Sequence, residues 1–295
     1  MTIRTIVPTT TKPRAPRRHK RPWWRSIAKH MILTLSALLM IYPLIWMLAA
    51  SFKPDAVIFQ DLSIFSGGFT TDNYVKGWNT LQLPFGTYLL NSALVVAGCI
   101  LGNLVSCSMA AYAFARLQFR GRKWMFAAML VSIMLPFHVV IIPQYILFSQ
   151  IGWLNTFLPL IVPKLLATDA FFVFLMVQFI RGLPKDLDEA ARIDGAGHPR
   201  IFLQVILPLM VPALATTAIF TFIWTWSDFF SQLIYLTDPN TLTVPVALRL
   251  FIDPMTQSSY GAMFAMSTVS LLPVFIAFLI GQRFLVKGIA TTGLK

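Results

Sequence analysis

Predominantly apolar stretches of about 20 residues recur along this sequence of 295 residues, and a hydrocarbon core about 30 Å thick requires helices of that length. Only 12% of the residues are charged, whereas a water-soluble domain usually carries about a quarter. Inside lipid, backbone hydrogen bonds are satisfied only in helices or closed barrels, and the unbroken apolar runs lack the alternation of a barrel. The sequence therefore predicts an all-α membrane protein with six transmembrane helices. These helices are expected at residues 31–50, 87–114, 124–149, 157–180, 209–236 and 262–284.

Basic residues divide unevenly between alternate connections. Twenty of the 24 Lys and Arg residues fall in the two terminal segments and in the loops after the second and fourth spans. The remainder, three in the opposite loops and one inside a span, are Lys53, Lys76, Arg249 and Lys164. Cytoplasmic loops of membrane proteins are enriched in Lys and Arg. We therefore expect a multi-pass membrane protein with both termini in the cytoplasm.

Residues 1–30 are polar and rich in Pro, Thr and Arg, which predicts a basic, disordered cytoplasmic tail. Residues 31–295 are then expected to form a single transmembrane domain. The net charge of +13 raises the question of nucleic acid binding. Because the basic residues are spread over several loops and not gathered into one groove, we expect contact with membrane lipid and none with nucleic acid.

The cytoplasmic loop between the fourth and fifth spans, residues 181–208, has the pattern of a helix–turn–helix. Pro184 and Asp186 predict the start of a short helix, with Asp186 as its N-cap. Gly195 offers a stop without a side-chain penalty, and Pro199 is suited to open a second helix.

A motif runs through this loop: Glu189-Ala190-Ala191, then Gly195, then Ile206-Leu207-Pro208. Its order and its spacing, slightly compressed at the end, resemble the cytoplasmic signature of the membrane-spanning permeases of ATP-binding-cassette importers. In that family the short helix sits in a cleft of the ATPase subunit, and the glutamate contacts an arginine there. The resemblance implies ATPase coupling by Glu189, Ala190, Ala191, Asp194, Gly195 and Pro208.

Four further segments resemble the carbohydrate branch of that family, which includes the maltose-type permeases: residues 123–143, 151–156, 226–229 and 284–293. The resemblance covers residues 30–295 and implies a multi-pass protein of the bacterial inner membrane. It implies a subunit that forms half of the pathway for a solute, most simply a sugar or oligosaccharide. An ATPase dimer, a second permease subunit and an extracytoplasmic solute-binding protein are the implied partners.

The phosphate-binding loop G-x-x-x-x-G-K-[ST] is missing from the sequence, and residues 288–295 come nearest, with Leu294 where Lys is required. We therefore expect a transport subunit that is not an enzyme and holds no cofactor, with ATP and Mg²⁺ bound by the partner ATPase. A metal site has no support either. Cys99 and Cys107 would lie about 12 Å apart on a helix, and the four His residues form no cluster.

Ionisable residues inside spans are costly and are candidates for function. One interpretation places Lys164, Asp169 and Asp228, with the aromatic ring of Trp226, around a polar pathway that hydrogen-bonds substrate hydroxyls. The other interpretation is that Lys164 and Asp169 pair with each other and that Lys164 reaches the outer surface. Aromatic residues in membrane helices also pack against lipid or other helices, so both interpretations stay open.

Two other classes of membrane protein remain as alternatives. A stand-alone secondary transporter driven by an ion gradient is expected to show internal repeats and paired carboxylates within its spans, and the intramembrane charges here are sparse. A membrane-bound enzyme would require a cluster of His, Asp or Glu at one membrane face, which the sequence does not offer.

Overall fold

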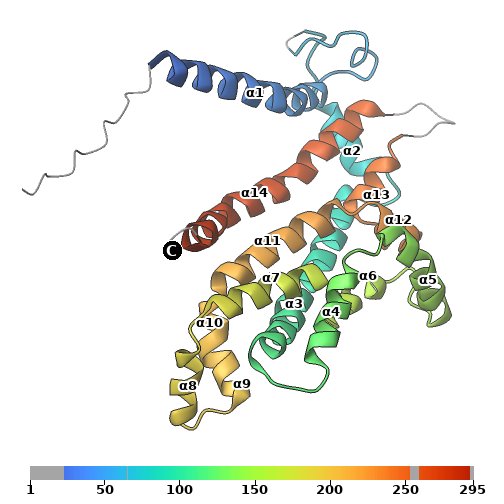
Figure 1. The fold of residues 1–295 in the computed structure, drawn as a ribbon. Coiled ribbons are helices and arrows are strands. Elements are labelled where there is room, and N and C mark those ends of the chain that lie inside the picture. Colours follow the sequence, from blue (N-terminus) through green and yellow to red (C-terminus); the bar gives the residue numbers. More distant parts are fainter. Residues whose placement is uncertain (1–22, 65, 253–258, 293–295) are drawn as a thin grey trace, which may run out of the picture. The chain divides into compact units, whose positions relative to one another are not determined.

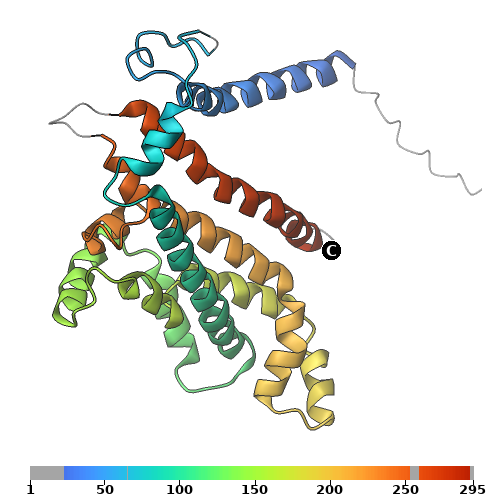
Figure 2. The ribbon, with the colours of Figure 1, turned by 180° about the vertical axis from the view of Figure 1, so that it is seen from behind.

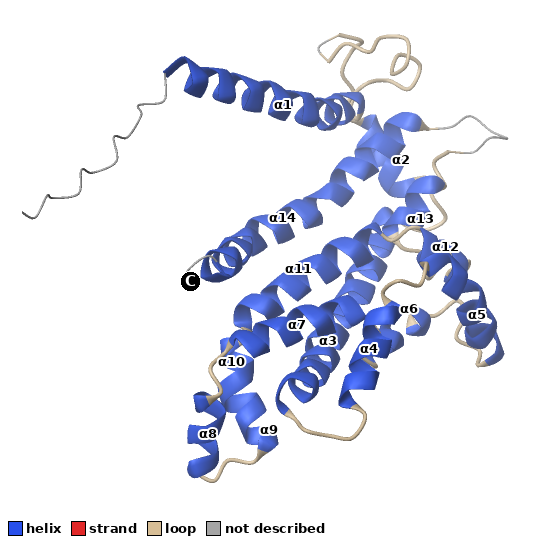
Figure 3. Cartoon of the chain, in the orientation of Figure 1, coloured by secondary structure: helices blue, strands red, loops and turns tan. Residues whose placement is uncertain are grey.

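The computed structural model describes residues 23–64, 66–252 and 259–292, and every regular element in these residues is a helix (Figure 3). The all-α prediction is confirmed. The chain divides into two compact units, residues 1–46 and 47–295. Most of the expected tail, residues 1–22, lies outside the described residues, as does the end of the chain at 293–295. Residues 23–30 of that expected tail belong to a helix.

The first helix is α1 (Trp23–Ala50), whose last residues fall in the second unit. The remaining helices, labelled in Figure 1, are α2 (Asp72–Asn79), α3 (Phe85–Arg116), α4 (Arg122–Ser132), α5 (Phe137–Gln150), α6 (Leu158–Leu165), α7 (Ala170–Gly182), α8 (Asp186–Ile193), α9 (His198–Ile201), the π-helical turn η1 (Phe202–Ile206), α10 (Leu207–Leu209), α11 (Val211–Ser227), α12 (Phe230–Tyr235), α13 (Val244–Arg249) and α14 (Tyr260–Thr292).

Prolines open several of these helices. A proline at the first or second position begins α6, α9, α10, α11 and α13: Pro159, Pro199, Pro208, Pro212 and Pro245. The position suits proline because the first backbone N–H groups of a helix have no partner within it.

In the described residues, four helical segments are long and apolar enough to cross a membrane: Ile27–Ala50, Phe85–Arg116, Leu158–Gly182 and Tyr260–Gln282. Two bent pairs of helices bring the number to six if each pair is one span. Each predicted span therefore has a counterpart, but three of the six are not continuous helices.

The third predicted span is broken, so the prediction of one helix over 124–149 is wrong. α4 ends at Ser132, α5 begins at Phe137, and the two helices are bent by 103°. Pro136 immediately precedes α5. It has no N–H to donate and disfavours the helical conformation in Leu135, which explains the break at this place.

The fourth and fifth predicted spans are interrupted as well. Residues 166–169 separate α6 from α7, and Ala167 has a φ of 55°, a left-handed conformation that no α-helix contains. α11 ends at Ser227, and Asp228 has an extended backbone with a ψ of 99° before α12 begins. The prediction of a continuous helix over 209–236 is therefore wrong beyond Ser227. It is also wrong at its start, because Met210 separates His198–Leu209 from Val211–Ser227, and these two segments are bent by 74°.

α3 is the central helix of the second unit. It contacts α6, α7 and α11, and α11 in turn contacts α14 (Figures 1 and 2). Gly102 permits the close approach of α6, because a Cβ at this position would lie 3.0 Å from the carbonyl carbon of Lys164.

Two clusters of buried side chains stabilise this arrangement. The first gathers around Phe85 and Tyr88, near the start of α3. The second gathers around Tyr112, near the end of α3, and includes Ile201 and Met210 from the segment that follows α8. The second cluster thus anchors the segment of α8 to α10 at one end of α11, whereas α12 and α13 lie at the other end (Figures 1 and 2).

Candidate functional site

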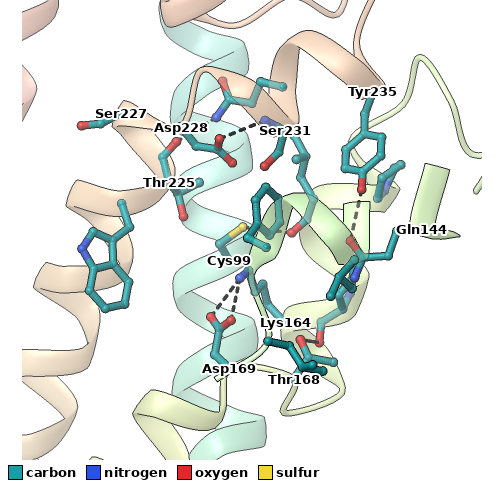
Figure 4. Close-up of a pocket in the computed structure, with 18 of the residues that line it drawn as sticks. Cys99, Gln144, Lys164, Thr168, Asp169, Thr225, Ser227, Asp228, Ser231 and Tyr235 are labelled. Carbon is teal, nitrogen blue, oxygen red and sulfur yellow. Dashed lines mark hydrogen bonds and ion pairs between the residues drawn. The ribbon is translucent and has the colours of Figure 1, made fainter. Parts of the chain in front are cut away.

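The three interrupted spans meet at a cavity of about 750 Å³ (Figure 4). Ser132 and Phe137 line it from either side of the first break, Thr168 from the second and Asp228 from the third. Irregular backbone at membrane depth is tolerated where it is buried in protein or lines a water-filled space, and substrate sites of transporters lie at interrupted helices. The breaks therefore mark this cavity as a candidate pathway. Its polar lining consists of Ser132, Gln144, Lys164, Thr168, Asp169, Thr225, Ser227, Asp228, Ser231, Gln232 and Tyr235.

The break between α6 and α7 is held from the central helix. The hydroxyl of Ser106 on α3 donates to the carbonyl of Lys164 at 2.6 Å and accepts from the N–H of Ala167 at 3.2 Å. Thr168 adds a hydrogen bond to the carbonyl of Pro163 at 2.8 Å. Because neighbouring side chains satisfy the backbone groups that the break frees, the interruption is a stable feature of the fold.

Lys164 and Asp169 face each other across this break. The Nζ of Lys164 lies 2.7 Å from Oδ1 and 2.9 Å from Oδ2 of Asp169. The buried amide of Asn103 donates to Oδ2 of Asp169 at 2.7 Å and to the hydroxyl of Thr221 at 3.0 Å. The expected pairing of Lys164 with Asp169 is observed, and both charged residues also line the cavity (Figure 4). That Lys164 reaches the outer surface stays a prediction. Contact of either residue with a solute stays a prediction.

Asp228 lies between α11 and α12. Its Oδ1 accepts a hydrogen bond from the N–H of Ser231 at 3.1 Å and so caps the first turn of α12 from the residue before the N-cap position, Phe229. The amide of Gln232 donates to the carbonyl of Thr225 at 2.8 Å, which satisfies an acceptor that the end of α11 leaves free. Oδ2 of Asp228 makes no hydrogen bond with a described residue, so it remains open to a donor that enters the cavity (Figure 4).

The structure does not bring Trp226 to this cavity. Its side chain is buried and stacks on Phe222, with ring centroids 5.5 Å apart. Its Nε1 donates to the carbonyl of Ser270 at 3.2 Å. Trp226 therefore joins α11 to α14, which corrects its expected place on the pathway.

Several residues of the site were missed by the sequence reasoning. Asn103 holds Asp169 in place, Gln232 stabilises the end of α11, and Gln144 accepts a hydrogen bond from Tyr235 at 3.2 Å. All lie within predicted spans. A search for amide side chains in apolar runs, and not for ionisable groups alone, would have found Asn103, Gln144 and Gln232.

The loop after α7 forms α8 and α9. Gly195 has a φ of 78° after the end of α8, and Pro199 stands at the start of α9, as the sequence suggested. The predicted N-cap is wrong: Lys185 occupies that position, without a side-chain hydrogen bond, and Asp186 is the first helical residue. A carboxylate in the first turn still interacts favourably with the helix dipole.

Most residues of the expected coupling motif are solvent-exposed in this chain. Glu189 is exposed, and its carboxylate makes no hydrogen bond or ion pair with a described residue. Ala191 is half-buried. The other exposed members are Ala190, Asp194, Gly195 and Pro208.

A family model described as the binding-protein-dependent transport system inner membrane component matches residues 102–291. The matched region contains the coupling motif and all three breaks. The chain belongs to this family. The permease is therefore a multi-pass membrane protein that works in binding-protein-dependent transport.

Related permeases span nearly the same length. The trehalose/maltose transport system permease protein MalG of Thermococcus litoralis is 33% identical over 273 residues, which cover 91% of this chain and 98% of the relative. The diacetylchitobiose uptake system permease protein NgcG of Streptomyces coelicolor is 32% identical over 255 residues, with 86% and 84% covered. These relatives confirm that the permease is a transport subunit and not an enzyme.

The fold is also that of a solved structure. A chain in the crystal structure of a bacterial ABC transporter involved in the import of the acidic polysaccharide alginate superposes with a TM-score of 0.79 at 22% identity. The match covers 92% of the permease and 100% of that chain. In the described part of the permease, no group of three or more His, Cys, Asp or Glu side chains is placed to hold a metal ion.

Proposed function

We propose that the permease forms half of the membrane pathway for a sugar or oligosaccharide, and that a second permease subunit forms the other half. The observation that carries this proposal is the cavity at the three helix breaks. Its volume of about 750 Å³ is within the range of about 300–1,000 Å³ that is usual for ligand sites. Hydroxyl and amide groups dominate its polar lining, and these groups both donate and accept hydrogen bonds, as sugar hydroxyls do.

The named substrates of the relatives support the same chemical class. MalG is named for trehalose and maltose, and NgcG for diacetylchitobiose. Trp224 and Phe137 add aromatic rings to the cavity wall, and such rings present apolar surface beside polar partners. Membership of a binding-protein-dependent family argues against the alternative of a stand-alone transporter driven by an ion gradient.

The loop of α8 and α9 is the proposed docking site for an ATPase dimer, which binds ATP and Mg²⁺. The carboxylate of Glu189 has no partner within the described residues, so it is available to a guanidinium group. Ala190 and Ala191 leave room for the partner to approach closely. A binding protein is proposed to deliver the solute at the opposite, extracytoplasmic face.

The solute class is tested with the assembly of permease, ATPase and binding protein in proteoliposomes. We expect ATP hydrolysis to rise several-fold when the binding protein is loaded from a panel of neutral di- and oligosaccharides, together with uptake of the labelled sugar. Amino acids and short peptides serve as the comparison panel. Stimulation by that panel, and by no saccharide, would contradict the assignment.

The orientation of the chain is tested by labelling single cysteines in intact cells. The two native cysteines are buried and are replaced by alanine. We expect a membrane-impermeant maleimide to label Gln60→Cys and Asn79→Cys from outside, and Lys185→Cys and Arg200→Cys only after permeabilisation; all four positions are exposed. Labelling of the last two in intact cells would place the loop of α8 and α9 outside and remove the proposed docking site.

A further inference from the structure

A buried ion pair joins the central helix to the loop of α8 and α9. Arg116 is the last residue of α3, and its Nε lies 2.8 Å from Oδ2 of Asp188 on α8. The side chains are only 4% and 9% exposed. The charge of Asp188 is therefore directed into the permease and is compensated by α3.

Three other contacts join the last turns of α3 to the loop of α8 and α9. The Nη2 of Arg116 donates to the carbonyl of Leu183 at 2.9 Å, just before α8. The hydroxyl of Tyr112, one turn earlier, lies 3.3 Å from Nδ1 of His198 on α9. The Tyr112 ring also contacts the ring of Phe202, with centroids 5.2 Å apart. The end of α3 thus holds both helices of the loop.

Stability alone does not explain this pair. Desolvation offsets much of the attraction in a buried ion pair, and an apolar pair of similar size is often at least as stable. The pair is also incompletely satisfied: Oδ1 of Asp188 is buried without a hydrogen-bond partner among the described residues, and the Nε–H of Arg116 is not in hydrogen-bonding geometry. A positional role explains the pair better than a stabilising one.

The two adjacent carboxylates of α8 face different surroundings. Asp188 is buried against Arg116, whereas Glu189 is exposed. Successive residues of a helix do not share a face, so α8 directs one carboxylate to the permease and the other to solvent. A displacement of α8 by a docked partner would act on Asp188 directly.

α3 leads from this pair to the cavity. It is one unbroken helix from Phe85 to Arg116, and Asn103 lies about 20 Å from Arg116 along it. Asn103 donates to Asp169, which is paired with Lys164 in the cavity wall. α3 therefore makes a polar contact with α8 at its last residue and with the cavity wall near its middle, and so connects the two.

We propose that Arg116 and Asp188 are positioning residues that carry a displacement of α8 through α3 to the Lys164–Asp169 pair. This proposal rests on the proposed docking of an ATPase at α8. It assigns transmission of the motion to Asp188 and docking to Glu189.

The test follows a cavity cysteine, Thr168→Cys, in a permease without native cysteines, assembled with its ATPase. In this parent protein we expect MgATP to change the labelling rate of the cysteine by a small-molecule thiol reagent. Arg116→Asp and Asp188→Arg should each reduce the nucleotide-dependent change in labelling rate about tenfold, a typical coupling between sites, while the ATPase still copurifies.

Two further variants serve as rescue and control. The double exchange, Arg116→Asp with Asp188→Arg, should restore most of the nucleotide-dependent change in labelling rate. Arg120→Asp, at an exposed arginine after α3, is the matched control and should behave like the parent.

Each outcome decides between the two proposals. Single variants that keep the full response to MgATP overturn the role of the ion pair. A parent that neither binds the ATPase nor responds to MgATP overturns the proposed function instead. If Arg116→Asp and Asp188→Arg are not obtained as folded protein, the near-isosteric variant Asp188→Asn decides. A response to MgATP equal to that of the parent overturns the inference. Loss of the response to MgATP with normal ATPase binding supports the inference.

Discussion

Replacing Glu189 by lysine is expected to abolish ATPase docking and with it solute-stimulated uptake. The side chain is exposed and makes no hydrogen bond or ion pair with a described residue, so the fold of the permease should be unaffected. The substitution places an ammonium group opposite the arginine that the family resemblance implies in the ATPase cleft. Like charges across an interface cost several kcal/mol, which corresponds to about a 100-fold loss of affinity or more. Copurification of the ATPase with tagged permease and stimulated ATP hydrolysis measure the two effects.

Asp72→Lys provides the control for Glu189→Lys. Asp72 is exposed at the start of α2, in a segment predicted to lie on the other side of the membrane, and the substitution changes the net charge equally. It should leave copurification of the ATPase unchanged, and Glu189→Gln should fall between the wild type and Glu189→Lys. Unchanged docking and stimulation in Glu189→Lys would refute the assigned role.

Substitutions at Asp228 are expected to lower uptake by about tenfold or more, since hydrogen bonds to charged groups contribute about 1.5–3 kcal/mol. The carboxylate lines the cavity, and its Oδ2 makes no hydrogen bond with a described residue. Asp228→Asn keeps an oxygen that accepts from the N–H of Ser231, whereas Asp228→Ala removes the cap of α12 as well. Initial rates of solute uptake and the yield of assembled complex are measured on the same preparations.

The two variants at Asp228 separate the roles of this residue. If the carboxylate binds solute, Asp228→Asn should lower uptake with normal yield and basal ATP hydrolysis. If it only caps α12, Asp228→Asn should behave like the wild type and Asp228→Ala should lose yield, by about 0.5–2 kcal/mol of stability for a lost cap. Normal uptake and yield in both variants would remove Asp228 from the pathway.

The spans were predictable because hydropathy is a property of each segment by itself. α3 begins and ends within two residues of the span expected at 87–114. The helical pattern of the loop was predictable as well, because Gly195 and Pro199 act on the backbone locally. In both cases the residues of the segment itself were sufficient to predict its secondary structure.

The breaks within spans were not predictable in the same way. The third apolar run contains both Pro136 and Pro143, yet only Pro136 marks a break, and Pro143 lies within α5. The break at Ala167 is held by Ser106, a residue far away in the sequence. Asn103 was missed for the same reason, since its partners, Asp169 in the break before α7 and Thr221 on α11, come from distant segments of the chain. Contacts between distant segments decided these features, and the periodicity of one segment does not report them.

The pairing of Lys164 with Asp169 also bears on how the permease enters the membrane during synthesis. A single charge at the centre of a span costs about 2.5–3.5 kcal/mol on translocon insertion scales. Both partners of this pair belong to one segment, five positions apart, and the break between α6 and α7 brings them together, so each neutralises the other within the same span. Insertion of this span then does not depend on a charged partner from another helix, and Asn103 completes the network when α3 packs beside it. Loss of either charge would leave the other to enter lipid alone.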